Sequence, residues 1–145
     1  MKNYLALAAA IVSLVLATTN AQAAEPLELQ KVMKDLGKNM QIVTDGISRE
    51  DWVLVEKTSR LIAEHPQPPF TEKMRIVGFM GTNMGKFKAF DEQTHEAANE
   101  MATAAQEKNG QRVISSFQKL QTSCLGCHQA YRPTFVEHFY GKAAN

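Results

Sequence analysis

Residues 113–131, VISSFQKLQTSCLGCHQAY, carry the most regular pattern in the chain. Their apolar, aromatic and sulfur-bearing side chains recur in steps of four and three residues, at Val113, Phe117, Leu120, Cys124, Cys127 and Tyr131. This spacing puts the six side chains on one face of an α-helix, with the periodicity of a helix that packs in a bundle. Pro133 follows and should end or bend the helix.

Residues 29–47 show the same helical spacing. The apolar positions are Leu29, Met33, Leu36, Met40, Val43 and Ile47. A second helix is expected to open with Ser48 as its N-terminal cap, followed by Glu50 and Asp51 in its first turn. It ends before the segment 65–69, HPQPP, because prolines cannot continue a helix.

The middle of the chain is less regular. Glycines interrupt the apolar run over residues 70–82, which predicts a loop or a broken turn. A third helix is expected to begin at Met84 and to end at Asn109-Gly110. Its inner face is less hydrophobic than those of the other helices and includes Asp91. No segment alternates with a two-residue period. We therefore predict an all-α fold, an antiparallel four-helix bundle with up-down-up-down topology.

The composition agrees with one small domain. The chain has 145 residues, of which 44% are hydrophobic and 21% charged, and this excludes a disordered or collagen-like protein. Sixteen Lys and Arg against fifteen Asp and Glu leave a net charge of +1. Such a balance argues against a dedicated nucleic-acid binder, which usually has a basic excess.

The N-terminus has the features of an export signal. Lys2 precedes the apolar run 5–16, and the small-residue triplet Ala21-Gln22-Ala23 follows. We expect residues 1–23 to be a cleaved signal peptide and residues 24–145 to form the mature four-helix domain. The alternative is a membrane anchor, but spanning a bilayer takes about 20 apolar residues. No later segment is apolar enough to span, so we expect an exported, periplasmic protein.

Cys124-Leu125-Gly126-Cys127-His128 is a C-x-x-C-H motif, which is typical of covalent haem attachment. Each cysteine forms a thioether with one haem vinyl group, and the imidazole of the next residue can be the proximal ligand of the iron. Two alternatives use the same residues. A dithiol oxidoreductase normally has its motif at a helix N-terminus after a strand, and a structural zinc site needs about four ligands.

The mature chain resembles the class II c-type cytochromes, which include cytochromes c′ and their low-spin, methionine-ligated relatives. The resemblance rests on residues 124–132, CLGCHQAYR, which match the C-x-x-C-H-x-x-Y-R ending of that family, and on residues 32–40 in the first helix. It implies a four-helix bundle with one covalently attached haem c, and its iron, on the C-terminal helix. It also implies that Arg132 lies near His128 or a haem propionate, unless Arg132 is a solvated cation at the helix end. Pairing through the first helix, common among these relatives, makes a homodimer an expectation.

The sixth position of the iron distinguishes the functions within this group. In an up-down-up-down bundle the first and last helices are antiparallel neighbours, so the start of the first helix lies level with His128. Met33 is the first candidate ligand, and the low-spin relatives have a methionine at the matching position. Met40 shares its face but lies about 10 Å further along the axis. The distal side could also be unfilled. His138 in the C-terminal tail is a weaker rival, whereas His65 is expected to be exposed and His95 to lie on a solvated face.

Three functions follow from these readings. The first hypothesis is a periplasmic electron carrier, not an enzyme, with iron ligated by His128 and Met33 and with redox proteins as partners. The second is a five-coordinate cytochrome c′ that binds carbon monoxide or nitric oxide. The third is a thiol–disulfide oxidoreductase that contains no haem.

Overall fold

A computed structural model describes residues 27–141 of the chain and contains no strand in that range. Five α-helices follow one another, with a single 3-10 turn, η1 (Gly81–Asn83), between the third and the fourth. They are α1 (Glu28–Ser48), α2 (Trp52–Ala63), α3 (Phe70–Met80), α4 (Met84–Gln106) and α5 (Gly110–Tyr140). The predicted signal peptide, residues 1–23, lies outside the described residues.

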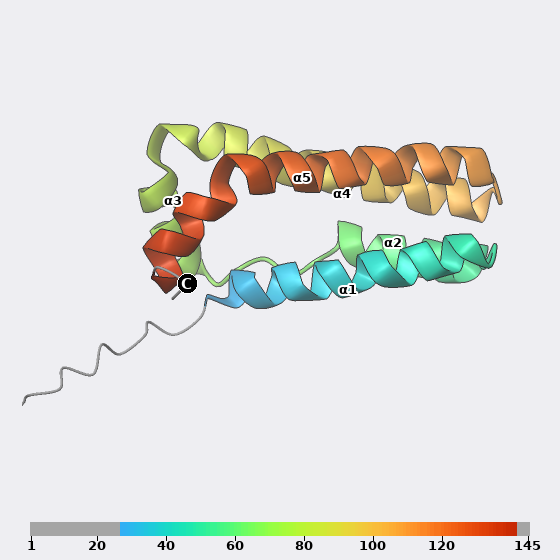
Figure 1. Ribbon diagram of the computed structural model, residues 1–145, viewed down its shortest axis with the longest axis horizontal. Helices are drawn as coiled ribbons and strands as arrows, with labels where there is room; N and C mark the ends of the chain where they lie inside the picture. The colour runs from blue at the N-terminus through green and yellow to red at the C-terminus, as the bar shows by residue number, and fades with distance from the viewer. Residues whose placement is uncertain (1–26, 142–145) are drawn as a thin grey trace, which may run out of the picture.

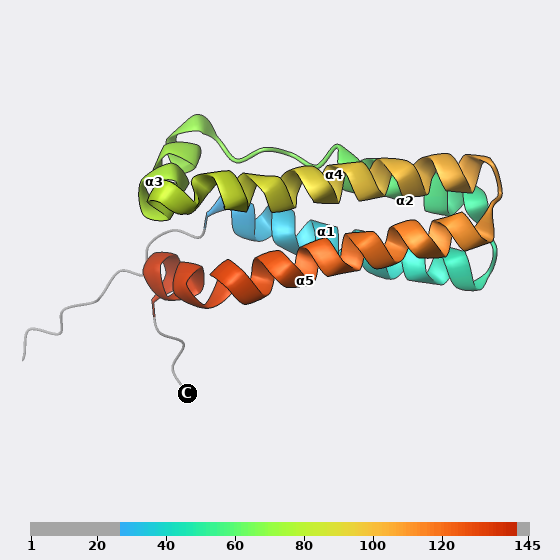
Figure 2. The ribbon, with the colours of Figure 1, turned by 90° about the horizontal axis from the view of Figure 1, so that it is seen from above.

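Four of the helices form the bundle that the sequence predicted. Figures 1 and 2 show α1, α2, α4 and α5 running in alternating directions along one long axis. Close packing joins α1 to α2, α2 to α4 and α4 to α5, and the pair α1 and α5 lies outside this series. The all-α, up-down-up-down prediction is therefore confirmed. None of the described helices is long and apolar enough to cross a membrane.

The turn between α1 and α2 differs in one detail from the prediction. Ser48 is the last residue of α1, and the cap of α2 is Asp51, whose side chain accepts a hydrogen bond of 3.1 Å from the backbone N–H of Leu54. Gly46 is buried at this turn, and a Cβ there would lie 2.9 Å from a methyl carbon of Val55. A larger residue would push the two helices apart.

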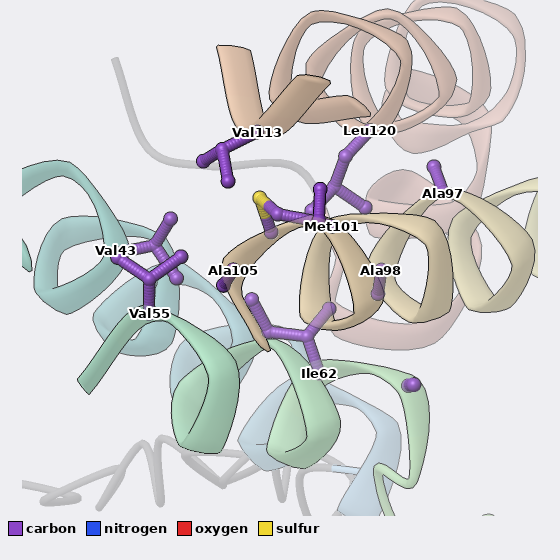
Figure 3. Packing of buried hydrophobic residues seen from close by; sticks show 11 residues of the cluster. Val43, Val55, Ile62, Ala97, Ala98, Met101, Ala105, Val113 and Leu120 are labelled. Carbon is purple, nitrogen blue, oxygen red and sulfur yellow. The ribbon is translucent and has the colours of Figure 1, made fainter. Parts of the chain in front are cut away.

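The main core, which we call the bundle cluster, is drawn in Figure 3. Its buried members are Val43, Val55, Ile62, Ala63, Ala97, Ala98, Met101, Ala104, Ala105, Val113 and Leu120. Met101 of α4 is fully buried among side chains from the other three helices. The alanines of α4 explain why the inner face of this helix is only weakly hydrophobic in the sequence. Their small side chains let α2 and α5 approach the α4 backbone closely.

A second, smaller core lies at the other end of the molecule. This tail cluster contains Leu27, Ile76, Met80, Phe135 and Phe139. The prediction of a loop over residues 70–82 was wrong for most of that range, because α3 is a regular helix that buries one side against the tail of α5. Pro133 lies inside α5, and Figure 1 shows the helix turning near its red end. The bend brings the tail onto α3.

Glu72 of α3 caps the start of α1. Its two carboxylate oxygens accept hydrogen bonds of 2.8 Å from the backbone N–H groups of Glu28 and Leu29. Leu27, the residue before the helix, has an apolar side chain and cannot cap it. Glu72 is only 8% exposed, so its negative charge is held where the helix dipole and two unpaired donors favour it.

We expect Glu72→Ala to lower the free energy of unfolding by about 2 kcal/mol, because two backbone donors lose a charged acceptor. Urea unfolding followed by circular dichroism measures the loss. Glu92→Ala is the control, since Glu92 is exposed and pairs only with Lys88 in the same helix, and about 0.5 kcal/mol or less is expected. Equal losses in the two variants would contradict the capping role.

Candidate functional site

The C-x-x-C-H motif lies in the middle of the longest helix. α5 begins at Gly110, so several helical turns precede Cys124. Cys124 and Cys127 are free and half-buried, and their spacing puts both sulfurs on one side of the helix. Cys124 packs against the bundle cluster, whereas Tyr131, two turns further on, packs against the tail cluster. The motif therefore spans the region between the two cores.

Both thiols are held in the protonated form. Burial raises the pKa of Cys124, and the pKa of Cys127 rises to about 11, first through burial and then through the charges of Cys124 and Asp91. A dithiol oxidoreductase needs the opposite, a pKa lowered by a helix N-terminus or a nearby cation. The mid-helix position and the raised pKa values weigh against that function.

His128 is exposed at the end of the motif. Partial desolvation lowers the pKa of His128, and the positive charge of Arg132, one turn further along α5, lowers it further. Its imidazole is therefore neutral at pH 7, with a lone pair free to bind a metal. Arg132 is also exposed, close enough for its charge to act on His128.

α4 holds this part of α5 in place by close contacts. The hydroxyl of Ser123 donates a hydrogen bond of 2.8 Å to the carbonyl of Phe90, and the hydroxyl of Thr94 lies 2.9 Å from that of Ser123. A Cβ at Gly126 would lie only 2.8 Å from a ring carbon of Phe90. The glycine inside the motif thus lets an aromatic ring of α4 pack directly against the α5 backbone.

Met33 lies on α1 at the level of the motif. α1 ends and α5 begins at the same end of the bundle (Figure 1). From that end, Met33 lies about 22 Å along α1, and the motif spans about 21–27 Å along α5, at 1.5 Å per residue. Met40 lies only about 12 Å along α1 and packs against the bundle cluster. Met33 is 40% exposed and belongs to neither cluster.

The side chains at this level fit a large apolar cofactor. Buried side chains fill the bundle on one side of the motif and the tail on the other, whereas several apolar residues between them are only partly buried, although Val32 of α1 is buried. The partly buried residues include Leu36, Phe87 and Phe90. Two thiols, one neutral imidazole and a surrounding set of half-buried apolar side chains are the groups that would hold a haem c.

Two histidines lie elsewhere than the sequence predicted. His65 was expected to be exposed, but its side chain is only 7% exposed; His95 was expected on a solvated face, but its Nδ1 bonds the carbonyl of Ala63. The two rings stack on each other with their centroids 4.6 Å apart, beside Asp91. The only sequence signal for this group was Asp91 itself, an acidic residue on the inner face of α4. His138 stacks on Phe79 in the tail.

Comparison with known proteins supports the cofactor assignment. Residues 80–132 match the family model of cytochrome c′. The matched range runs from the end of α3 to Arg132 and includes Cys124, Cys127 and His128. It supports a c-type cytochrome of class II with covalently bound haem c and iron. No individual curated protein matched the chain.

We expect Cys127→Ala to leave at most one thioether, so that covalent haem falls to a small fraction of the wild-type amount. The pyridine haemochrome spectrum and the mass of the exported protein measure this. Ser115→Ala, on the exposed side of the same helix, should retain the full haem content. A wild-type amount of haem that resists acid–acetone extraction from Cys127→Ala would refute the attachment site.

We expect Gly126→Ala to destabilise the protein by about 1–2 kcal/mol, although alanine favours a helix. The added methyl group would meet the Phe90 ring, which would have to shift away from the α5 backbone. Gly78→Ala in α3 is the matched control, because a Cβ there has no neighbour within 4 Å, and a gain of about 0.5–1 kcal/mol is expected. Thermal unfolding distinguishes the two, and a gain in both variants would contradict the close α4–α5 contact.

Proposed function

We propose that this protein is an exported monohaem cytochrome that carries one electron between redox proteins of the periplasm. His128 and Met33 are the axial ligands in this proposal, and the protein catalyses no reaction of its own. The observation that carries it is the position of Met33, which lies level with the C-x-x-C-H motif on the antiparallel helix α1. The region between these two helices is also the least closely packed side of the bundle.

The side chains suit an electron carrier in three respects. When bound, the haem supplies a one-electron couple between ferric and ferrous iron. A thioether ligand such as that of Met33 raises its reduction potential. The neutral imidazole of His128 needs no deprotonation to bind iron, and the guanidinium of Arg132 would favour the haem propionates.

The surface beside the motif suits a redox partner. Leu125, inside the motif, is 57% exposed, and Met33 is also partly exposed. Both residues are apolar, so this edge offers exposed apolar side chains to a partner. Transient redox complexes use small surfaces of this kind. Export of residues 24–145 to the periplasm and pairing into a homodimer belong to the same proposal.

A second function has support from one observation. Met33 belongs to neither cluster and is 40% exposed, so the packing of the two cores does not fix the position of its sulfur. Without that ligand, the distal side would face apolar residues of α1 such as Leu36. An open, apolar distal side would bind carbon monoxide or nitric oxide, as the five-coordinate alternative requires.

Met33→Leu tests the choice between the two functions. Leucine has a similar volume but cannot ligate, so the packing cost should stay below about 1.5 kcal/mol. If Met33 is a ligand, the variant shifts the haem from low spin toward high spin, lowers the reduction potential and binds carbon monoxide when reduced. Absorption spectra in both redox states and a redox titration measure these changes.

Met40→Leu is the matched control, since the same change is made on the same helix within the bundle cluster. It should leave the spin state and the potential at their wild-type values. A low-spin spectrum with an unchanged potential in Met33→Leu would refute Met33 as the ligand. A wild-type protein that is already high-spin would support the gas-binding function instead.

A further inference from the structure

His65, Asp91 and His95 form a compact group of metal-binding side chains outside the C-x-x-C-H motif. His65 follows the last turn of α2, and Asp91 and His95 lie one turn apart on α4. The Nε2 atom of His65 is 3.4 Å from one carboxylate oxygen of Asp91, and the Nε2 atom of His95 is 3.4 Å from the other. The three ligand atoms lie within 4.8 Å of one another.

Backbone carbonyls fix the protonation of both imidazoles. The Nδ1 atom of His65 lies 2.9 Å from the carbonyl oxygen of Ile62, and that of His95 bonds the carbonyl oxygen of Ala63. A carbonyl can only accept, so each Nδ1 carries the hydrogen. In the neutral ring, Nε2 then holds a lone pair. Metal-bound histidines commonly have this outer hydrogen bond, which orients the ring and selects the ligating nitrogen.

The two Nε2 atoms flank one carboxylate, and this arrangement favours a cation between them. The hydrogen bond to Asp91 raises the pKa of His65, so a proton can take this place, and so can a metal ion. Protons on both Nε2 atoms would place two positive rings face to face, with an interplanar angle of 10°. A metal ion would carry the charge between the side chains instead. The distance of 3.4 Å between each Nε2 and its Asp91 oxygen is longer than a usual N–H···O hydrogen bond of roughly 2.9–3.0 Å. It is close to the distance of about 3.3 Å between two ligand atoms of a tetrahedral zinc ion.

The group is both anchored and accessible. The side chain of His65 is 7% exposed, while those of His95 and Asp91 are 29% and 37% exposed. The proline-rich segment 66–69 begins directly after His65 and limits how far that residue can move. An ion can therefore enter beside Asp91, and water can complete its coordination.

We propose that His65, Asp91 and His95 bind one zinc ion or a similar divalent transition-metal ion, at a site that lies beside the C-x-x-C-H motif but shares no ligand with the iron. Two imidazoles and a carboxylate suit zinc, with water as the fourth ligand. Binding requires the stacked rings to tilt toward each other so that both Nε2 atoms point at the ion. The ion would tie the end of α2 to α4. The proposal does not depend on the proposed electron-carrier function.

Isothermal titration of the purified, tag-free holoprotein with zinc chloride at pH 7.5 tests this site. We expect one zinc ion per chain, and a loss of affinity of roughly tenfold or more in Asp91→Asn and His95→Gln. His138→Gln is the matched control, because it removes a histidine outside the group and should retain wild-type affinity. The haem absorption spectrum, recorded on every sample, shows separately whether the haem site is intact.

A second measurement covers variants that fail to fold. Anomalous diffraction at the zinc edge from wild-type crystals grown with zinc should show a peak within bonding distance of all three side chains. No zinc binding, equal affinity in Asp91→Asn and wild type, a loss of affinity in His138→Gln, or an anomalous peak elsewhere would overturn the proposal.

Discussion

The packing of α4 against α5 around Gly126 is the contact on which the rest of the site depends. Phe90 fits against the glycine backbone, and Ser123 bonds the Phe90 carbonyl, so the two helices keep one register at the motif. Because α2 packs on α4 and α1 packs on α2, this register passes through the bundle to α1. The level of Met33 relative to the motif follows from it, although α1 and α5 are not closely packed on each other.

The parts of the fold that follow from local periodicity were predictable from the sequence. The apolar steps in residues 29–47 predicted α1 nearly to its ends, and Asn109-Gly110 marked the turn before α5. The steps in residues 113–131 predicted α5 as far as Tyr131, but the helix continues past Pro133 to Tyr140. α3 was missed because glycines lower its intrinsic helix propensity. Its stability comes from distant contacts, namely the tail cluster and the bonds from Glu72 to the start of α1, and no local pattern encodes these.

The C-x-x-C-H motif and the His65–Asp91–His95 group also differ in how far local sequence could predict them. The motif residues Cys124, Cys127 and His128 fall within five residues of the chain. Their spacing alone therefore predicted haem attachment. His65 follows α2 and Asp91 lies on α4, and only the packing of α2 on α4 brings them together. Asp91 stood out as a charged residue in an apolar pattern. Its partner His65 was missed because it precedes a proline-rich segment, which predicted an exposed loop. An acidic residue on the inner face of a helix, with a histidine one turn away, is the sequence feature that should prompt a search for such a group.

The two sides of the bundle differ in how much stability a substitution costs, and this affects how the function could change during evolution. On the α2–α4–α5 side, buried alanines and the Gly126 contact make most substitutions costly. On the α1–α5 side, Met33 contributes to neither core, so its replacement costs little stability. In the ligation that we propose, the sixth position of the iron could therefore change while the fold and the C-x-x-C-H motif stay the same. One bundle could then serve either as the proposed electron carrier or as the gas-binding alternative, depending on whether residue 33 of α1 can ligate.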